Sequence, residues 1–277
     1  TSAVKVSGTS FTASLTGLKA ATAYQYRVSV DGTAGEEQSF TTAEAVPLTN
    51  GSFDDWSSVP AGKNTLWQPW AEGGTSFWDT GNKGATTVGN SNSTPTTETS
   101  TGRGQAASLE SKYIVLKFAA GNIFTGTYVR TDGTNGVLQF GRPFTSFPSK
   151  LRIHYKYNCV PINKSGDDDF KYLVGRPDSC QVYIALTDWD APLEIRTRPS
   201  ERQLFVPSDP KVIAYGELTK GESVSSWTQA DIVLDYRYTN RTPKYIVVVA
   251  SASKYGDYFT GGEGSKLWLD ECELIYD

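Results

Sequence analysis

The sequence has few of the residues that bind metals or form disulfides. Its 277 residues include one histidine, three cysteines and no methionine. A single histidine, His154, excludes a histidine-rich zinc site and leaves little basis for a Ser-His-Asp triad. Three dispersed cysteines are too few for a metal cluster. Cys159 and Cys180 border one loop and could pair, whereas Cys272 is expected to be a lone core residue.

The chain also lacks a strongly basic region and a long apolar run. It carries 26 Lys and Arg against 30 Asp and Glu, a net charge of −4. The absence of a basic cluster argues against a nucleic-acid partner. No apolar run approaches the roughly 18 residues of a membrane-spanning helix, so we expect the chain not to span a membrane. It does not begin with methionine, and we expect a targeting segment ahead of Thr1 that has been removed.

The abundant residues favour strands and turns. There are 15 Tyr, 12 Phe, 7 Trp and 26 Gly, and no segment shows the apolar period of an amphipathic helix. Apolar residues alternate over 151–157 and run unbroken over 245–250, which predicts a half-buried and a fully buried strand. In the last strand, 267–276, they do not keep one parity, which predicts a β-bulge near Asp270 or Glu271. The sequence therefore predicts an all-β fold.

The first 44 residues are expected to form a separate β piece. Leu18, Thr22 and Tyr24 have the spacing of a tyrosine corner and resemble the second half of a fibronectin type III or Ig-like domain. Half a sandwich leaves one sheet face uncovered. We therefore expect either that the first half precedes Thr1 or that this piece docks onto the rest of the chain, with residues 48–277 forming the main domain.

Two stretches suggest a sugar site. The strand that begins at Cys180 ends in Asp188-Trp189-Asp190, and an indole flanked by carboxylates suits a sugar ring and its hydroxyls. The alternative is a strand end with a half-buried tryptophan and two solvated aspartates. Residues 64–79 crowd aromatics into a glycine-rich segment, which either covers a core edge or forms a binding wall. The candidate sugar-binding residues are Trp67, Trp70, Trp78, Asp188, Trp189, Asp190, Arg196, Tyr255 and Tyr258.

Hydrolysis of a glycoside would require two carboxyl groups about 5–10 Å apart, one with a raised pKa. Asp188 and Asp190 lie two positions apart in extended chain, or roughly 6–7 Å. The catalytic candidates are Asp188, Asp190 and Glu194, and Glu217 and Glu263 are also available. A third alternative is a structural or adhesive surface protein whose aromatics form only a core.

The two ends of the main domain resemble those of galactose-binding-like jelly rolls found in many carbohydrate-binding modules. The opening is NGSFDDW at 50–56, and the closing strand contains LDE at 269–271. That resemblance implies a structural Ca²⁺ held by the side chains of Asp54 and Asp270 and the backbone of Ser52, oxygen ligands of the kind this ion prefers. The alternative is a plain turn beside a surface acid pair.

Six segments together resemble the putative carbohydrate metabolism domain of Bacteroidetes cell-envelope proteins. They are LESKY (109–113), KFAAGN-x-FTG (117–126), FGRPF (140–144), CQVYIALTDWD (180–190), VIAYGE (212–217) and SASKYGDYFTGGEGS-x-LWLDE-x-ELIYD (251–277). The resemblance covers about residues 48–277 and implies a jelly-roll β-sandwich, often behind an Ig-like domain. It further implies a carbohydrate partner, a periplasmic or cell-surface location, and a lipid anchor on a removed N-terminal segment. It assigns no catalytic residue.

Overall fold

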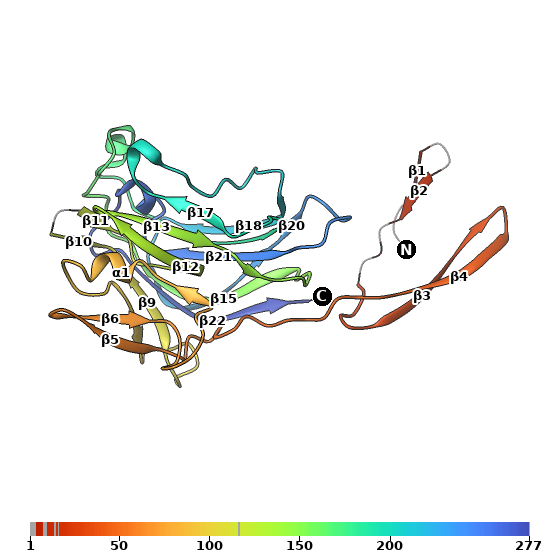
Figure 1. Ribbon diagram of the computed structural model, residues 1–277, viewed down its shortest axis with the longest axis horizontal. Helices are drawn as coiled ribbons and strands as arrows, with labels where there is room; N and C mark the ends of the chain where they lie inside the picture. The colour runs from red at the N-terminus through yellow and green to blue at the C-terminus, as the bar shows by residue number, and fades with distance from the viewer. Residues whose placement is uncertain (1–3, 8–9, 14, 16, 116, 277) are drawn as a thin grey trace.

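The computed structural model describes residues 4–7, 10–13, 15, 17–115 and 117–276. The ends of the two expected domains, Thr1 and Asp277, lie outside these residues. Figure 1 shows a sandwich of two sheets, with a separate β piece reaching away from it near the N-terminus. The expected all-β sandwich is confirmed. Within the described residues, no helix is long and apolar enough to cross a membrane.

The larger sheet of the sandwich, here called the large sheet, has nine strands among the described residues. Its main path runs β17-β13-β12-β21-β16-β18-β20, and β7 and β14 pair with β12 and β21. Its strands are β7 (Trp78–Asp79), β12 (Asn122–Asp132), β13 (Asn135–Phe140), β14 (Arg142–Pro143), β16 (Cys180–Thr187), β17 (Leu193–Arg196), β18 (Val212–Lys220), β20 (Asp235–Tyr236) and β21 (Tyr245–Ser251).

The small sheet has the strand order β19-β15-β22-β9-β8. Its strands are β8 (Ser93–Thr96), β9 (Ala106–Glu110), β15 (Lys150–Asn158), β19 (Val224–Val233) and β22 (Lys266–Ile275). The remaining strands form hairpins: β1 (Val4–Ser7) with β2 (Ser10–Ala13), β3 (Ala23–Val30) with β4 (Thr33–Thr41), β5 (Ser57–Ala61) with β6 (Asn64–Gln68), and β10 (Lys112–Ile114) with β11 (Lys117–Ala119). The helical turns are α1 (Asn82–Ala85), η1 (Asp168–Leu173), η2 (Pro199–Glu201) and η3 (Gly256–Tyr258).

The core between the sheets follows the alternation of their strands. The apolar side chains of β15 at 151, 153, 155 and 157 are all buried, as their spacing predicts. Those of β16 at 182, 184 and 186 belong to the same core cluster. The alternating residues of these two strands therefore fill the interior of the sandwich.

The large sheet is buried on its outer face as well. Tyr183 and Ala185 of β16 and Val247 and Val249 of β21 belong to a second apolar cluster. The unbroken apolar run of β21 is therefore that of a central strand covered on both faces. The segment between β17 and β18 covers part of this outer face, where the Phe205 ring stacks on Tyr183 with centroids 5.2 Å apart.

The expected bulge in the last strand is confirmed. The register of β22 against β15 shifts between Arg152 and His154, whose partners are Glu273 and Asp270. At the bulge Glu271 has a φ of 48°. The extra residue resets the alternation, so that apolar side chains on both sides of the bulge reach one core. These side chains are Leu267, Leu269, Cys272 and Leu274.

The β3–β4 hairpin lies apart from the sandwich (Figure 1). The Tyr24 hydroxyl accepts a hydrogen bond of 2.7 Å from the backbone N–H of Lys19, the type of contact that a tyrosine corner makes. Tyr26 packs edge-on against Phe40 but stays 47% exposed. Leu48 belongs to the core of the sandwich, which is where the main domain was expected to begin. A partial Ig-like domain over residues 1–44 stays a prediction.

Two expectations about buried residues need correction. Trp78 is fully buried, packs on Phe53 and donates its indole N–H to the Thr49 carbonyl at 2.7 Å. Its ring therefore has no face for a sugar and instead fastens the start of the main domain to the core.

Cys159 and Cys180 are free thiols, so the suggested pairing is not formed.

Replacing Trp78 by Ala should cost about 3–5 kcal/mol of unfolding free energy, because it empties a core site and leaves the Thr49 carbonyl without its donor. Chemical denaturation would measure this loss. Trp227→Ala is the matched control, because Trp227 is half-buried on β19 of the small sheet. Equal losses in the two variants would contradict the structural role of Trp78.

Candidate functional site

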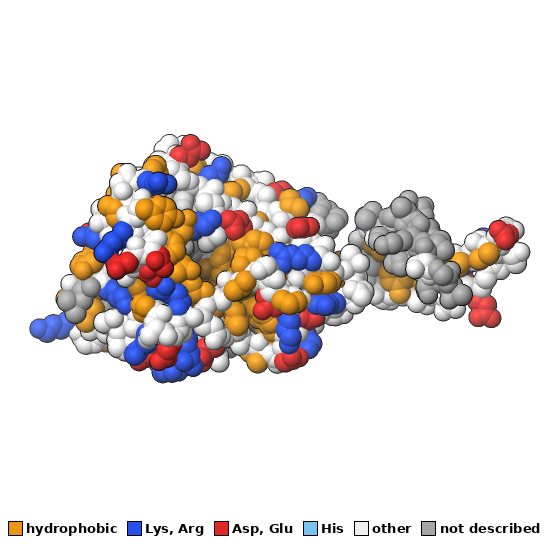
Figure 2. Space-filling model, turned by 90° about the horizontal axis from the view of Figure 1, so that it is seen from above, with side chains coloured by type: hydrophobic (Ala, Val, Ile, Leu, Met, Phe, Trp, Pro, Cys, Tyr) orange, Lys and Arg blue, Asp and Glu red, His pale blue; other side chains and the backbone are white. Residues whose placement is uncertain are grey.

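A pocket of about 240 Å³ opens on the outer face of the large sheet. Figure 2 shows a hollow with an apolar interior on this side of the molecule. The walls come from α1, the β10–β11 hairpin, the turn between β12 and β13, and residues 251–259. The aromatic side chains that line it are Phe118, Phe124, Tyr128, Phe140, Tyr183 and Phe259.

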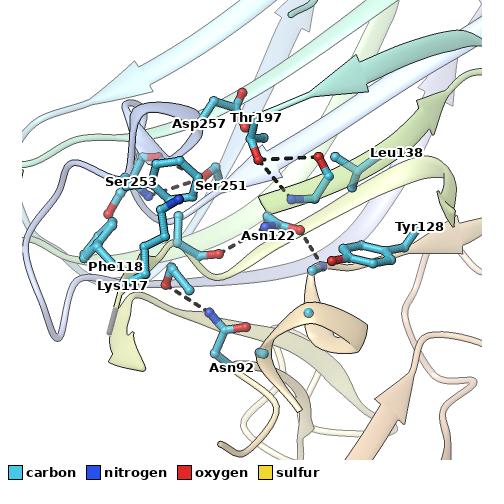
Figure 3. Close-up of a pocket in the computed structure, with 18 of the residues that line it drawn as sticks. Asn92, Lys117, Phe118, Asn122, Tyr128, Leu138, Thr197, Ser251, Ser253 and Asp257 are labelled. Carbon is cyan, nitrogen blue, oxygen red and sulfur yellow. Dashed lines mark hydrogen bonds between the residues drawn. The ribbon is translucent and has the colours of Figure 1, made fainter. Parts of the chain in front are cut away.

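Polar side chains surround this aromatic floor. In Figure 3, Asp257 and Thr197 lie on one side of the pocket and Asn92 on the opposite side. An apolar floor with a few directed polar groups is the usual composition of a small-molecule site. The polar and charged lining residues are Thr87, Asn92, Lys117, Asn122, Thr131, Thr134, Gln181, Thr197, Ser251, Ser253, Lys254 and Asp257.

The loop that carries Asp257 is fixed by close backbone packing. Gly261 and Lys164 form an isolated β-bridge with hydrogen bonds of 3.1 Å in both directions. A Cβ atom on Gly261 would lie 2.4 Å from the ring of Phe118 and 2.6 Å from the hydroxyl of Ser253. Only glycine allows the loop to approach the pocket wall this closely.

The two predicted tyrosines of this loop flank Asp257 in sequence but do not line the pocket. Phe170 packs against both, with ring centroids 5.2 Å from Tyr255 and 4.2 Å from Tyr258. The guanidinium of Arg202 lies 4.5 Å from the Tyr258 ring. Tyr255 and Tyr258 therefore hold the loop in place through contacts with Phe170 and Arg202, outside the pocket lining.

A buried carboxylate connects the same loop to the start of β16. Asp178 accepts hydrogen bonds from the Ser253 hydroxyl at 2.6 Å and from the backbone N–H groups of Gly262 and Ser179 at 2.7 and 2.8 Å. Burial raises the pKa of the Asp178 carboxyl, and these hydrogen bonds oppose the rise. Because Ser253 lines the pocket, these hydrogen bonds fix one residue of the pocket wall to the start of β16.

Asp257 differs from Asp178 in having no hydrogen bond or ion pair within the described part of the chain. Its side chain is exposed and lines the pocket. Desolvation by the surrounding protein raises the pKa of the Asp257 carboxyl to about 6, and the charge of Arg202 opposes the rise. Asp257 therefore retains its proton to a higher pH than an ordinary aspartate.

Glu217 lies at the edge of the pocket on the same face of the sheet. It pairs with Tyr183 across β16 and β18, and its carboxylate lies 3.3 Å from both Gln181 and Lys254, which line the pocket. The Tyr215 hydroxyl donates to it at 2.5 Å. Burial alone would raise the pKa of Glu217, but these hydrogen bonds and the charge of Lys254 outweigh it and lower the pKa.

Lys117 supplies a positive charge to the pocket. Its ammonium donates to the Asn135 side chain at 2.6 Å and lies 3.4 Å from the centre of the Phe259 ring. Burial lowers the pKa of Lys117, and the charges of Arg202 and Arg198 lower it further. Each of these arginines is paired with an aspartate.

The Asp188-Trp189-Asp190 stretch lies at the opposite end of β16 from the pocket residues Gln181 and Tyr183. Trp189 is only 5% exposed and packs edge-on against Phe205. Lys211 and Lys244 bind Asp190 and lower the pKa of its carboxyl to about 2. An exposed carboxyl that remains ionised at such low pH is poorly suited to donate a proton.

The other candidates, and Asp188 itself, do not line the pocket. Glu194 and Arg196 form an ion pair of 2.6 Å on β17. Asp188 lies 3.6 Å from Arg241. Trp67 lies on β6 and Trp70 follows it, and both are half-buried away from the pocket. The structure thus does not unite the predicted aromatic and acidic residues into one site.

The two aspartates proposed as calcium ligands each accept hydrogen bonds from other parts of the chain. Asp270 is buried and accepts hydrogen bonds from the backbone N–H and hydroxyl of Ser100 at 2.7 and 2.8 Å and from the N–H of Glu271 at 3.0 Å. Asp54 is exposed and accepts the Gln105 N–H at 2.8 Å. No group of three or more His, Cys, Asp and Glu side chains in the described residues is placed to hold a metal. Protein donors thus account for the buried carboxylate without an ion, and calcium at Ser52, Asp54 and Asp270 stays a prediction.

Sequence reasoning did not single out the residues that line the pocket. They are spread over several strands and loops, and only the fold brings them together. One signal was available, because the segments that carry the family resemblance supply much of the lining. Segment 117–126 contributes Lys117 and Asn122, segment 180–190 contributes Gln181, and segment 251–277 contributes Asp257.

Two solved structures from Bacteroides species are similar to this chain in fold. A crystal structure of a putative glycoside hydrolase from Bacteroides vulgatus ATCC 8482 superposes with a TM-score of 0.61 at 23% identity, over 81% of this chain and 96% of that one. Another, from Bacteroides thetaiotaomicron VPI-5482, gives a TM-score of 0.62 at 19% identity, over 92% of this chain and 79% of that one. Identities this low show a shared fold, that of a β-sandwich protein.

The family is established by the sequence itself. The family model described as "Putative carbohydrate metabolism domain" matches residues 52–275. The chain therefore belongs to this family, as the six segments indicated, and has a carbohydrate-associated role. No curated protein matches the chain.

Replacing Asp270 by Ala should lower the unfolding free energy on the order of 3 kcal/mol, because Ser100 and Glu271 lose a charged acceptor. Thermal melting with and without EDTA would test the metal at the same time. If calcium binds here, EDTA will lower the melting temperature of the wild type and leave that of the variant unchanged. A stability equal to wild type in the variant would contradict the structural role of Asp270.

Proposed function

We propose that the pocket on the outer face of the large sheet binds a carbohydrate and that the protein takes part in glycan capture or utilisation. The observation that carries this proposal is the composition of the pocket, in which aromatic rings form the floor and amide, hydroxyl and charged side chains form the rim. A sugar presents C–H groups on one face of its ring and hydroxyl groups around its edge. Such a pocket offers a partner to both.

The pocket suits a sugar better than the Asp188-Trp189-Asp190 stretch does. Trp189 is buried against Phe205 and offers no open ring face. Asp190 is already bound to Lys211 and Lys244. In the pocket, by contrast, the Asp257 carboxyl has no hydrogen-bond or ion-pair partner among the residues that the structure describes. A free polar group beside an aromatic floor is available to a ligand.

A glycan array would test the proposal with a pair of matched variants. Val88 lines the pocket and is 54% exposed, whereas Val59 on β5 is 41% exposed and lies outside the lining. Val88→Trp should fill part of the pocket and weaken binding to the glycans recognised by the wild type at least tenfold, about 1.4 kcal/mol. Val59→Trp should bind as the wild type does.

Asp190→Ala distinguishes the two candidate sites in the same experiment. We expect binding to be unchanged, because Asp190 is remote from the pocket lining. Binding lost in Asp190→Ala but kept in Val88→Trp would move the site to the end of β16. Absence of binding to any glycan on the array would contradict the proposal and favour a structural or adhesive role. The expected cell-envelope location and lipid anchor stay predictions.

A further inference from the structure

Asp257 lines the pocket and Glu217 lies at its edge, and the two carboxyl groups have opposite environments. Asp257 enters it from η3 and has no hydrogen-bond or ion-pair partner among the described residues. Glu217, on β18, accepts hydrogen bonds from Tyr215, Thr219 and Lys254. Among the described residues Asp257 thus has no partner for its carboxyl, whereas the donors around Glu217 hold that group as an anion.

Both groups reach the same part of the sheet. Glu217 lies directly opposite Tyr183, and side chains at directly opposed positions have Cβ atoms about 4.5–5.5 Å apart. The Tyr183 ring forms part of the pocket floor and experiences the charges of both Asp257 and Glu217. The Glu217 side chain keeps about a third of its surface exposed. Asp257 and Tyr183 line the pocket, and Glu217 contacts the lining residues Gln181 and Lys254, so both carboxyl groups border one pocket.

We propose that this pocket hydrolyses a glycosidic bond, with Asp257 as the proton donor and Glu217 as the ionised carboxylate that activates water. The inference rests on the proposed carbohydrate binding and adds a reaction to it. It also replaces the acidic pair at Asp188 and Asp190, because Asp190 is neutralised by two lysines.

The reaction consumes one water and needs no further reactant. Asp257 transfers its proton to the bridging oxygen as the bond from that oxygen to the anomeric carbon breaks. Glu217 accepts a proton from the attacking water as the water oxygen bonds to the anomeric carbon. The two products are a hemiacetal and an alcohol. Afterwards Glu217 loses a proton to solvent and Asp257 regains one.

The directions of the two pKa shifts agree with these roles. The pKa of Asp257 is raised to about 6, which keeps a proton available in mildly acidic solution. The pKa of Glu217 is lowered, which keeps this group ionised in the same range. Environments that push two carboxyl groups apart in pKa distinguish the acid from the base. Activity should therefore fall as the pH rises above about 6, because Asp257 then loses its proton.

The test uses as substrate the glycan that the wild type binds on the array, with release of reducing ends as the readout. Asp257→Asn should retain binding and lose 10²–10⁴-fold in turnover, the usual contribution of a general acid. On a dinitrophenyl glycoside of the same sugar its loss should be much smaller, because that leaving group needs no proton. The fall in activity above about pH 6 should disappear in this variant.

Glu217→Ala should lose activity on both substrates, since water activation is needed for each. Added azide, a nucleophile that needs no base, should restore turnover of the dinitrophenyl glycoside, which a merely structural defect would not allow. Asp235→Asn and Glu222→Ala are the matched controls, because both side chains are exposed and lie outside the pocket lining. Both should behave as the wild type.

The possible failures are distinct. A glycan that binds in the pocket but is not cleaved by the wild type at any pH would overturn the hydrolysis proposal and leave binding intact. Normal turnover in Asp257→Asn or Glu217→Ala would overturn the assigned roles. Absence of glycan binding would instead remove the proposed function on which the inference rests.

Discussion

The structure depends on burial of the large sheet on both of its faces. Its central strands β16 and β21 place alternate residues in the core between the sheets and in a second apolar cluster outside. Burial of apolar surface, worth roughly 25 cal/mol per Å², therefore stabilises these two strands from both sides. Strands packed on both faces form a rigid support for side chains that bind a ligand. The candidate site uses this property, since its floor residue Tyr183 projects from β16.

The fold could be predicted from the sequence because strand patterns are local. Alternation over 151–157 placed those side chains in the core, and the broken parity near Asp270 indicated the bulge that the register shows. The unbroken run of β21 predicted a fully buried strand. Each of these signals depends on neighbours along one strand. Alternating apolar residues indicate a strand with one buried face, and an unbroken apolar run indicates a strand buried on both faces, whatever the order of the strands in the sheet.

The site could not be predicted in the same way, because its members meet only through strand order. Gln181 and Asp257 belong to different segments, and nothing in either segment shows that both reach one pocket. Trp189 misled for the opposite reason. Its local context suggests exposure, yet the distant Phe205 covers it, and the same Phe205 stacks on Tyr183. The tryptophan selected as a sugar contact instead packs against the ring that stacks on Tyr183.

The acidic residues show why residue type and spacing are insufficient to assign chemistry. Asp190 is solvated between two lysines and remains a strong acid. Asp178 is buried, but its hydrogen bonds to Ser253 and Gly262 commit it to structure. Desolvation raises the pKa of Asp257 as it does that of Asp178, but the exposed Asp257 side chain lines the pocket and is open to a ligand. A proton donor requires both properties at once, because enclosure holds the proton and an open face lets it reach a substrate. Among these three aspartates only Asp257 combines them.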